Sequence, residues 1–313
     1  MKTSSPRIFR VTGLVLFILT ASFVRVLGAE NASANDLPQV PIPLVPGGQV
    51  VPLWPPGSPS LRGKDQKEII TYAPGSQDRV QKVINIHNPS IEIHLARADR
   101  ANGTAIILAA GGGNKELNVG PEGLEVADWL GTLGVSSFIL RYRLQPYTSD
   151  GDALSDTLRS IQWVRAHSKD LGINPSKIGL MGFSAGGEQA AWAALRFTGG
   201  KTNSTDAMEA LSDRPDFVVL VYAGWRRMDL SRVPTNAPPA FLTSAGVDDA
   251  FHAKQTVEFY DAYFNAKIPA ELHIYGHGGH GGGIRPRNGI PLGKWQDRFV
   301  DWATDLAYFP PVK

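Results

Sequence analysis

The sequence contains no cysteine, carries almost no net charge and has a single long apolar run. Without cysteine, disulfide bonds and thiol chemistry are both excluded. The formal net charge of +2 gives no reason to expect nucleic acid or an anionic membrane as a partner. With 313 residues, of which 42% are hydrophobic and 19% charged, the chain is a globular protein long enough to bury a large core.

The apolar run lies at the N-terminus and has the layout of a secretory signal peptide. Basic residues precede the mostly apolar residues 11–24, and small residues suited to cleavage follow at Ala29 and Ala34. An uncleaved membrane anchor is the alternative, but Arg25 interrupts a run that is short for a span of ~20 residues. We therefore predict that residues 1–34 are a signal peptide and that the mature protein is secreted or periplasmic, with no membrane partner.

Proline marks the next segment and separates it from the rest of the chain. Residues 35–60 are rich in proline, so we expect an extended arm or linker there rather than a helix. From about residue 68 strand and helix patterns alternate, with no internal repeat and no second globular domain. We predict one catalytic domain over residues 61–313.

The alternation indicates the fold class. Continuous apolar segments such as Phe-Val-Val-Leu-Val-Tyr at residues 217–222 suit strands that are covered on both faces. We therefore expect an α/β fold with a mostly parallel central sheet and helices on both faces. The expected strands are residues 91–96, 105–109, 136–141, 178–181, 217–222, 240–244 and 271–275, and the expected helices are residues 121–133, 152–171, 185–197, 254–265 and 294–306.

One pentapeptide carries the strongest chemical signal. Gly-Phe-Ser-Ala-Gly at residues 182–186 follows an apolar strand and opens a helix, which is the setting of a nucleophile elbow. The turn strains the backbone of Ser184, and a Cβ at either glycine would clash with neighbouring elements. An ordinary glycine-rich turn is the competing interpretation. The flanking strand and helix favour an activated serine.

A serine hydroxyl needs a base to take its proton, and the base needs a third group to orient it. In this type of fold the order along the chain is serine, acid, histidine. His277 and His280 lie in a glycine-rich loop directly after the last expected strand, where an imidazole can reach Ser184. We choose His280 as the base, with His277 as the alternative. His252 begins a helix close to two acidic residues.

Two aspartates compete for the role of the acid. Asp248 and Asp249 both follow the strand at residues 240–244, and a carboxylate there can hydrogen-bond the imidazole Nδ1 and fix its tautomer. The other aspartate would then be a turn residue or a helix cap. Position alone does not separate them.

The oxyanion of an acyl-transfer intermediate needs backbone N–H donors. Ala185, directly after the serine, supplies one at the start of a helix. The triple glycine at residues 111–113 follows an early strand and lets the backbone turn its amides inward. A phosphate-binding loop would need a lysine and a hydroxyl after the last glycine, which Asn114-Lys115-Glu116 does not supply. A metal site at His277 and His280 lacks a third ligand, so we expect neither metal nor cofactor.

Taken in order, these motifs resemble those of the secreted α/β-hydrolase esterases of the acetyl xylan esterase and feruloyl esterase type, from bacteria that degrade plant or algal polysaccharides. The resemblance covers roughly residues 50–308. Its landmarks are Pro-Leu-Trp-Pro at 52–55, Ile-His-Asn-Pro at 86–89, the triple glycine, Glu-Gly-Leu-Glu-Val-Ala-Asp-Trp-Leu at 122–130, Leu-Arg-Tyr-Arg-Leu at 140–144, residues 182–187, and the ending at 271–281.

The resemblance implies an α/β-hydrolase fold and a set of roles. It assigns the nucleophile to Ser184, the base to His280 and the acid to Asp248, with Asp249 as the alternative if the loop is shifted by one. It assigns the oxyanion donors to Gly112, Gly113 and Ala185. The chain departs from the family pattern at Ala110 and Asn114, where proline and an aromatic residue are common, and at His252, where many relatives have proline.

These observations predict an exported serine esterase that removes small acyl groups, such as acetyl, from carbohydrate. A peptidase on this fold usually carries a gating domain and a lipase a large apolar lid, and the sequence suggests neither. A carbohydrate-binding protein on a degenerate hydrolase fold is a further alternative, against which the intact serine, acid and histidine argue. Trp225 is a candidate platform for a sugar ring or a packing residue.

Overall fold

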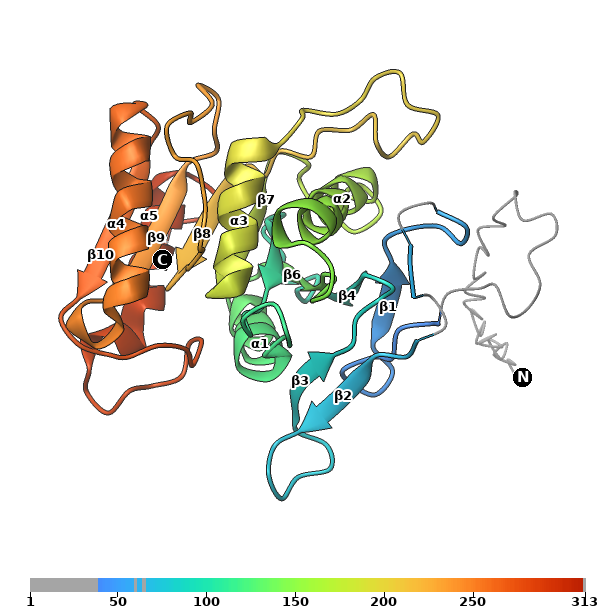
Figure 1. The fold of residues 1–313 in the computed structure, drawn as a ribbon, viewed down its shortest axis with the longest axis horizontal. Coiled ribbons are helices and arrows are strands. Elements are labelled where there is room, and N and C mark those ends of the chain that lie inside the picture. The colour runs from blue at the N-terminus through green and yellow to red at the C-terminus, as the bar shows by residue number, and fades with distance from the viewer. Residues whose placement is uncertain (1–38, 59–60, 64–65, 312–313) are drawn as a thin grey trace, which may run out of the picture.

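The computed structural model describes residues 39–58, 61–63 and 66–311 (Figure 1). The predicted signal peptide, residues 1–34, lies outside the described residues. Among the helices that are described, none is long and apolar enough to cross a membrane.

An eight-stranded sheet forms the centre of the molecule, in the order β1-β4-β6-β5-β7-β8-β9-β10 (Figure 1). The pairings of β1 with β4 and of β4 with β6 are antiparallel, and all others in this sheet are parallel. The predicted, mostly parallel sheet is therefore confirmed. The strands are β1 (Gln49–Pro52), β4 (Ser90–His94), β5 (Ala105–Ala109), β6 (Ser136–Arg141), β7 (Ile178–Phe183), β8 (Phe217–Val221), β9 (Ala240–Ala245) and β10 (Ala270–Tyr275).

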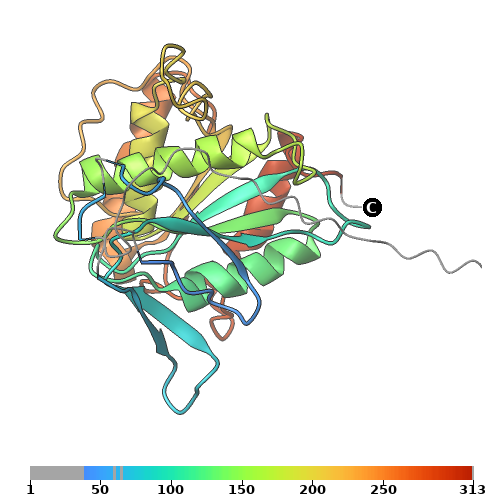
Figure 2. The ribbon, with the colours of Figure 1, turned by 90° about the vertical axis from the view of Figure 1, so that its right-hand side faces the viewer.

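Helices cover both faces of this sheet, as the apolar strands predict (Figure 2). Every residue of β5, β6, β7, β8 and β9 is buried. One face carries α1 (Glu125–Thr132) and α5 (Trp295–Asp305), and the other carries α2 (Leu154–Ala166), α3 (Ala185–Arg196) and α4 (Ala250–Asn265). Short helical turns precede four of these helices, namely η2 (Gly120–Leu124), η3 (Ser149–Ala153), η4 (Val247–Asp249) and η5 (Pro291–Lys294).

Three strands were not predicted, and one of them moves the expected domain boundary. β1 lies inside the proline-rich segment, yet it pairs with β4 at the edge of the main sheet, and Leu53 just after it is buried. The domain therefore begins before residue 49 rather than at residue 61. β2 (Ile69–Tyr72) and β3 (Val80–Ile84) form a separate antiparallel hairpin that projects from the body of the protein (Figure 1).

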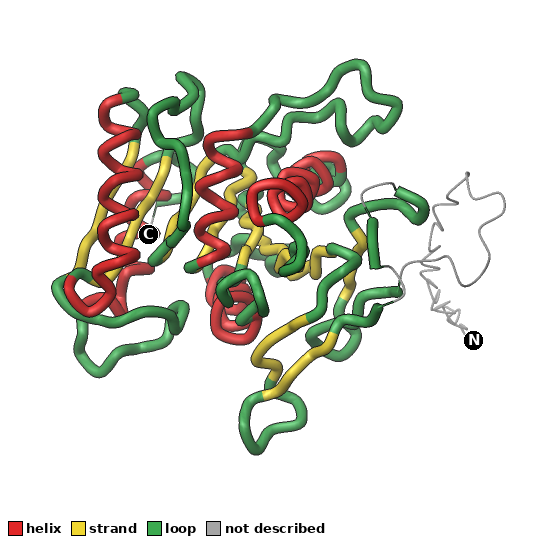
Figure 3. Tube along the Cα trace, viewed as in Figure 1, coloured by secondary structure: helices red, strands yellow, loops and turns green. Residues whose placement is uncertain are grey.

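The parallel arrangement determines where chemistry can take place. The carboxyl ends of parallel strands lie at one edge of the sheet, and the loops that follow them meet there. Figure 3 distinguishes the strands of the sheet from the loops and helices that connect them. The loops after β5, β7, β9 and β10 carry the triple glycine, Ser184, the two aspartates and His280, respectively. Residues from four distant parts of the sequence thus reach one place.

Candidate active site

Ser184 occupies a sharp turn between β7 and α3. Its backbone dihedrals are φ 52° and ψ −117°, a positive φ that is unfavourable for a residue with a Cβ. Two hydrogen bonds hold this conformation: the Ser184 N–H donates to the carbonyl of Val221 (3.0 Å), and the Ser184 carbonyl accepts from the N–H of Glu188 (3.1 Å). The strained turn keeps the hydroxyl at the edge of the sheet, where it is only partly buried.

The glycines around Ser184 are required by close backbone contacts. A Cβ on Gly182 would lie 2.1 Å from the carbonyl oxygen of Gly186, and a Cβ on Gly186 would lie 1.9 Å from that of Ala109. Side chains are excluded at both positions because backbone atoms cannot move aside. The steric reason that the sequence suggests for these glycines is confirmed.

A chain of hydrogen bonds links Ser184 to His280 and Asp249. The Ser184 Oγ lies 2.9 Å from Nε2 of His280, and Nδ1 of His280 lies 2.8 Å from Oδ2 of Asp249. The Asp249 side chain is 7% exposed and that of His280 is 37% exposed. With the proton on Nδ1 facing the carboxylate, Nε2 is left as an acceptor for the serine hydroxyl.

The aspartate in this hydrogen-bond chain is Asp249, which corrects the expectation of Asp248. The Asp248 carboxylate turns toward the start of the histidine loop, which we define as residues 276–283. It accepts the N–H of Gly278 at 2.9 Å and lies 3.3 Å from Nδ1 of His277. These hydrogen bonds, the one from Gly278 first, hold the pKa of Asp248 below its usual value. The tight turn of η4 sends neighbouring side chains in different directions, so only Asp249 faces His280.

His277, the alternative base, is placed at the surface. Its side chain is 74% exposed and pairs with Asp248. The loop position that the sequence favours for the base, His280, is the one that the structure brings to Ser184.

The triple glycine lies directly against the serine. A Cβ on Gly111 would be 2.8 Å from the Ser184 Cβ. Gly112 and Gly113 have φ of 141° and 63°, conformations that favour glycine. Among the described residues, no hydrogen bond uses the N–H of Gly112 or Gly113. Ala185 is the first residue of α3, where a helix leaves its N–H without an internal partner.

A buried hydrogen-bonded brace lies beneath this site. Glu122, in η2, is 2% exposed. Its carboxylate accepts the N–H of Gly111 at 2.8 Å and the hydroxyl of Tyr222 at 2.9 Å. The Tyr222 oxygen accepts the N–H of Gly283 at 2.8 Å. Glu122 and Tyr222 therefore connect the triple glycine to the end of the histidine loop.

Burial shifts the pKa of both side chains in this brace, Glu122 and Tyr222. It raises the pKa of the Glu122 carboxyl and places that of the Tyr222 hydroxyl well above its ordinary value. Tyr222 also meets the His280 ring edge-on, with centroids 5.0 Å apart. No sequence pattern indicates these contacts, because Glu122 stands in a helical pattern and Tyr222 ends an apolar strand.

Arg287 fixes the histidine loop from the outside. Its guanidinium donates to the carbonyls of Gly278, Gly279 and Gly281. A glycine-rich loop loses much conformational freedom when it is ordered. The guanidinium and the Asp248 carboxylate offset that cost by binding the loop backbone on both sides of His280.

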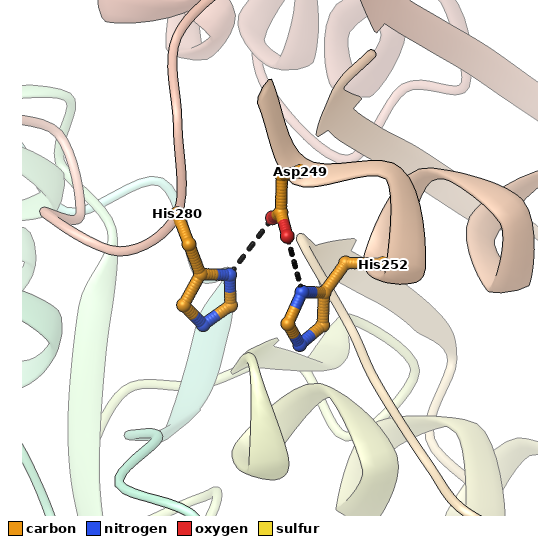
Figure 4. Close-up of side chains that lie close together, drawn as sticks. All are labelled: Asp249, His252 and His280. Atoms are coloured by element: carbon orange, nitrogen blue, oxygen red, sulfur yellow. Dashed lines mark hydrogen bonds and ion pairs between the residues drawn. The ribbon is translucent and has the colours of Figure 1, made fainter. Parts of the chain in front are cut away.

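A second histidine shares the carboxylate of Asp249 (Figure 4). Nδ1 of His252 lies 2.5 Å from Oδ1 of Asp249. The ring of His252 stacks on that of His280, with centroids 3.9 Å apart and planes 18° apart. Burial lowers the pKa of His252. The sequence places this residue near the acids, but its contact with the base depends on the turn into α4.

Asp249, His252 and His280 form a cluster of residue types that can bind a metal ion. Each offers a ligand atom, and these atoms lie within 4.8 Å of one another. However, the two carboxylate oxygens of Asp249 already pair with two different imidazoles, and nearly parallel stacked rings direct their nitrogen lone pairs side by side rather than to one point. Tetrahedral coordination needs converging ligands. The geometry therefore fits a hydrogen-bond network better than a metal centre.

A cleft of about 590 Å³ opens beside Ser184. Much of its lining is polar, including Asn114, Lys115, Gln145, Ser149, Glu188 and Arg226. Trp225 also lines it but is only 5% exposed, and it packs on Phe259 with centroids 5.8 Å apart. The structure thus favours the packing role of Trp225 over that of a sugar platform.

Asn114 replaces the aromatic residue that the family pattern places after the triple glycine. Its side-chain N–H donates to Glu188 at 3.2 Å, and the Ser149 hydroxyl donates to the same Glu188 oxygen at 2.9 Å. The cleft near the serine therefore holds an organised polar group in place of an apolar wall.

Comparison with known proteins supports this fold. A family model described as an alpha/beta hydrolase fold matches residues 128–274. An acetylxylan esterase from Xylanibacter ruminicola is 29% identical over 217 residues, which make up 59% of this chain and 42% of that protein. An endo-1,4-beta-xylanase B from Butyrivibrio fibrisolvens is 26% identical over 176 residues, or 47% of this chain and 28% of that protein. The chain spans less than half the length of both relatives.

A solved structure extends the likeness over most of the chain. The acetyl ester-xyloside bifunctional hydrolase from Caldicellulosiruptor lactoaceticus superposes with a TM-score of 0.70 and 27% identity, covering 85% of this chain and 99% of that one. The chain has the α/β-hydrolase fold, and the predicted resemblance to esterases of the acetyl xylan esterase type is confirmed. Two of these three proteins are named as ester-cleaving enzymes.

The brace generates a prediction about stability. Tyr222→Phe removes the hydroxyl and leaves both the Gly283 N–H and one Glu122 oxygen without their partner, so the free energy of unfolding should fall by about 1–3 kcal/mol. Chemical denaturation measures this change.

Tyr263→Phe is the matched control. Tyr263 is also fully buried, but in the described part of the chain its hydroxyl has no hydrogen-bond partner. We expect this variant to be as stable as the parent or more so. Equal losses in the two variants would contradict the bracing role of Tyr222.

Proposed function

We propose that this protein is an exported serine esterase that removes small acyl groups, principally acetyl, from plant or algal polysaccharides or oligosaccharides. The observation that carries the proposal is the hydrogen-bond chain Ser184–His280–Asp249 at the carboxyl edge of the sheet. That arrangement joins a nucleophile, a base and an orienting carboxylate. Export rests on the N-terminal signal pattern alone.

The geometry accounts for acylation of the serine. As Oγ of Ser184 attacks the ester carbonyl carbon, Nε2 of His280 takes the hydroxyl proton, and Asp249 stabilises the imidazolium that forms. The carbonyl oxygen becomes an oxyanion, for which the N–H groups of Gly112, Gly113 and Ala185 are the proposed donors. When the intermediate collapses, the bond to the alcohol breaks and His280 returns the proton to the leaving oxygen.

Water completes the reaction by the same steps. His280 takes a proton from water, whose oxygen attacks the acyl carbonyl, and the proton then passes to Oγ of Ser184 as the acid leaves. The residues present suffice for every proton transfer, so the mechanism requires no cofactor.

The polar lining of the cleft favours an ester of a carbohydrate over an ester of a lipid as the substrate. Asn114, Gln145 and Glu188 offer hydrogen-bonding groups beside the serine, and a sugar ring carries the hydroxyls to use them. A lipase would instead need a large apolar lining. The names of the acetylxylan esterase and of the acetyl ester-xyloside hydrolase point to the same class of substrate.

The first test removes the nucleophile. Ser184→Ala should abolish the release of acetate from acetylated xylan and the hydrolysis of p-nitrophenyl acetate, because no other group can form the acyl-enzyme. Circular dichroism checks that the variant is folded. Undiminished activity in the folded variant would refute the proposal, and activity on feruloylated arabinoxylan alone would refute the acetyl preference.

A second test separates the two neighbouring aspartates. Asp249→Asn should lower kcat about 10³–10⁴-fold, because the amide no longer stabilises the correct tautomer or the imidazolium. Asp248→Asn should retain most of the activity, since that carboxylate contacts His277 and the loop backbone. The reverse pattern would restore Asp248 as the acid.

A further inference from the structure

The side chain of His252 packs between the ring of His280 and the backbone that follows β8. It lies in the first turn of α4 and lines the cleft next to Ser184. A Cβ on Gly224 would come within 2.3 Å of the His252 ring, so one edge of the ring lies against that backbone. Its face is stacked on His280 at 3.9 Å. The ring therefore limits the rotation of the His280 imidazole.

The same ring also restricts the carboxylate. Oδ2 of Asp249 pairs with His280 and Oδ1 with His252, at 2.8 and 2.5 Å respectively (Figure 4). A carboxylate with both oxygens engaged cannot rotate about its own axis without losing a hydrogen bond. Because Asp249 is 7% exposed, solvent competes weakly for these oxygens.

We propose that His252 is a positioning residue of the proposed esterase. It orients Asp249 and His280, and it helps to set the pH below which the enzyme loses activity. It does so through its hydrogen bond to Asp249 and its stack on His280. The inference rests on the proposed function, since it concerns the efficiency of the Ser184–His280–Asp249 site.

His252 and His280 share the single negative charge of Asp249, and this sharing links His252 to the pH dependence of activity. Burial holds the pKa of His252 below its usual value, so at neutral pH the ring donates a hydrogen bond as an uncharged group. That hydrogen bond stabilises the Asp249 anion and leaves less of its charge for an imidazolium at His280. Removing it should strengthen the attraction between the Asp249 carboxylate and an imidazolium at residue 280, so that activity is lost at a higher pH on acidification.

Other charged and titratable groups surround the pair, but the proposed substitutions leave them in place. Tyr222 meets the His280 ring edge-on, and the Glu122 carboxylate interacts with the charge of His280. Asp249 contacts both rings, Arg287 binds the backbone of the histidine loop, and Lys115, Glu188 and Arg226 line the same cleft as His252.

Two substitutions separate the hydrogen bond from the stack. His252→Phe keeps an aromatic face but removes the donor. His252→Asn loses the ring but places its amide N–H close to where Nδ1 stood. We expect His252→Phe to lower kcat roughly tenfold and to raise the midpoint of the acidic limb of kcat/KM by about half a pH unit to one unit.

His252→Asn should keep the parent midpoint, because the amide restores a donor to Asp249. The pH profile of p-nitrophenyl acetate hydrolysis measures each variant, and thermal unfolding establishes that each is folded. If His252→Phe does not fold, His252→Ala removes the same donor and carries the same expected shift in midpoint.

His277→Phe is the matched control. It removes another histidine next to an aspartate, but one that is 74% exposed and pairs with Asp248, so kcat and the midpoint should match the parent. A donor-free variant at residue 252 with parental kcat and midpoint would overturn the proposal, as would an equal shift in His252→Asn. Activity surviving in Ser184→Ala would instead refute the proposed function, so the two failures are distinguishable.

Discussion

The hydrogen bond between His280 and Asp249 is the interaction on which the candidate site depends. His280 stands in a loop with six glycines among residues 276–283, which by itself would leave the imidazole without a fixed direction. The buried carboxylate of Asp249 supplies that direction and selects the tautomer whose Nε2 faces Ser184. Because the Asp249 carboxylate is only 7% exposed, water competes weakly for the oxygen that accepts this hydrogen bond.

The surrounding structure fixes the positions of Asp249 and His280 relative to each other. Asp249 follows β9 and His280 follows β10, and the two strands pair along their whole length. Arg287 and Asp248 fix the histidine loop, while Glu122 and Tyr222 tie it to the triple glycine. Polar groups distributed over several loops thus serve one purpose, which is to keep the reacting side chains in place before substrate arrives.

The sequence predicts the parts of this site that local patterns control. The strand–turn–helix pattern located Ser184, and the fixed order of partners in this fold led to His280. The choice between Asp248 and Asp249 was not accessible in the same way, because the direction of each side chain depends on the turn of η4 and on contacts with a loop 30 residues away. The same limit applies to Glu122 and His252, whose neighbours come from other elements, and to β1, which is a strand only because β4 lies beside it.

Covalent labelling shows most directly whether Ser184 is an activated nucleophile. A fluorophosphonate probe reacts with a serine whose hydroxyl proton is taken by a base, and peptide mass spectrometry locates the adduct. We expect a single adduct on Ser184, formed rapidly in the parent protein and only slowly in His280→Ala. Folded protein that stays unlabelled, or that is labelled at another residue, would contradict the assignment of this site as a serine esterase.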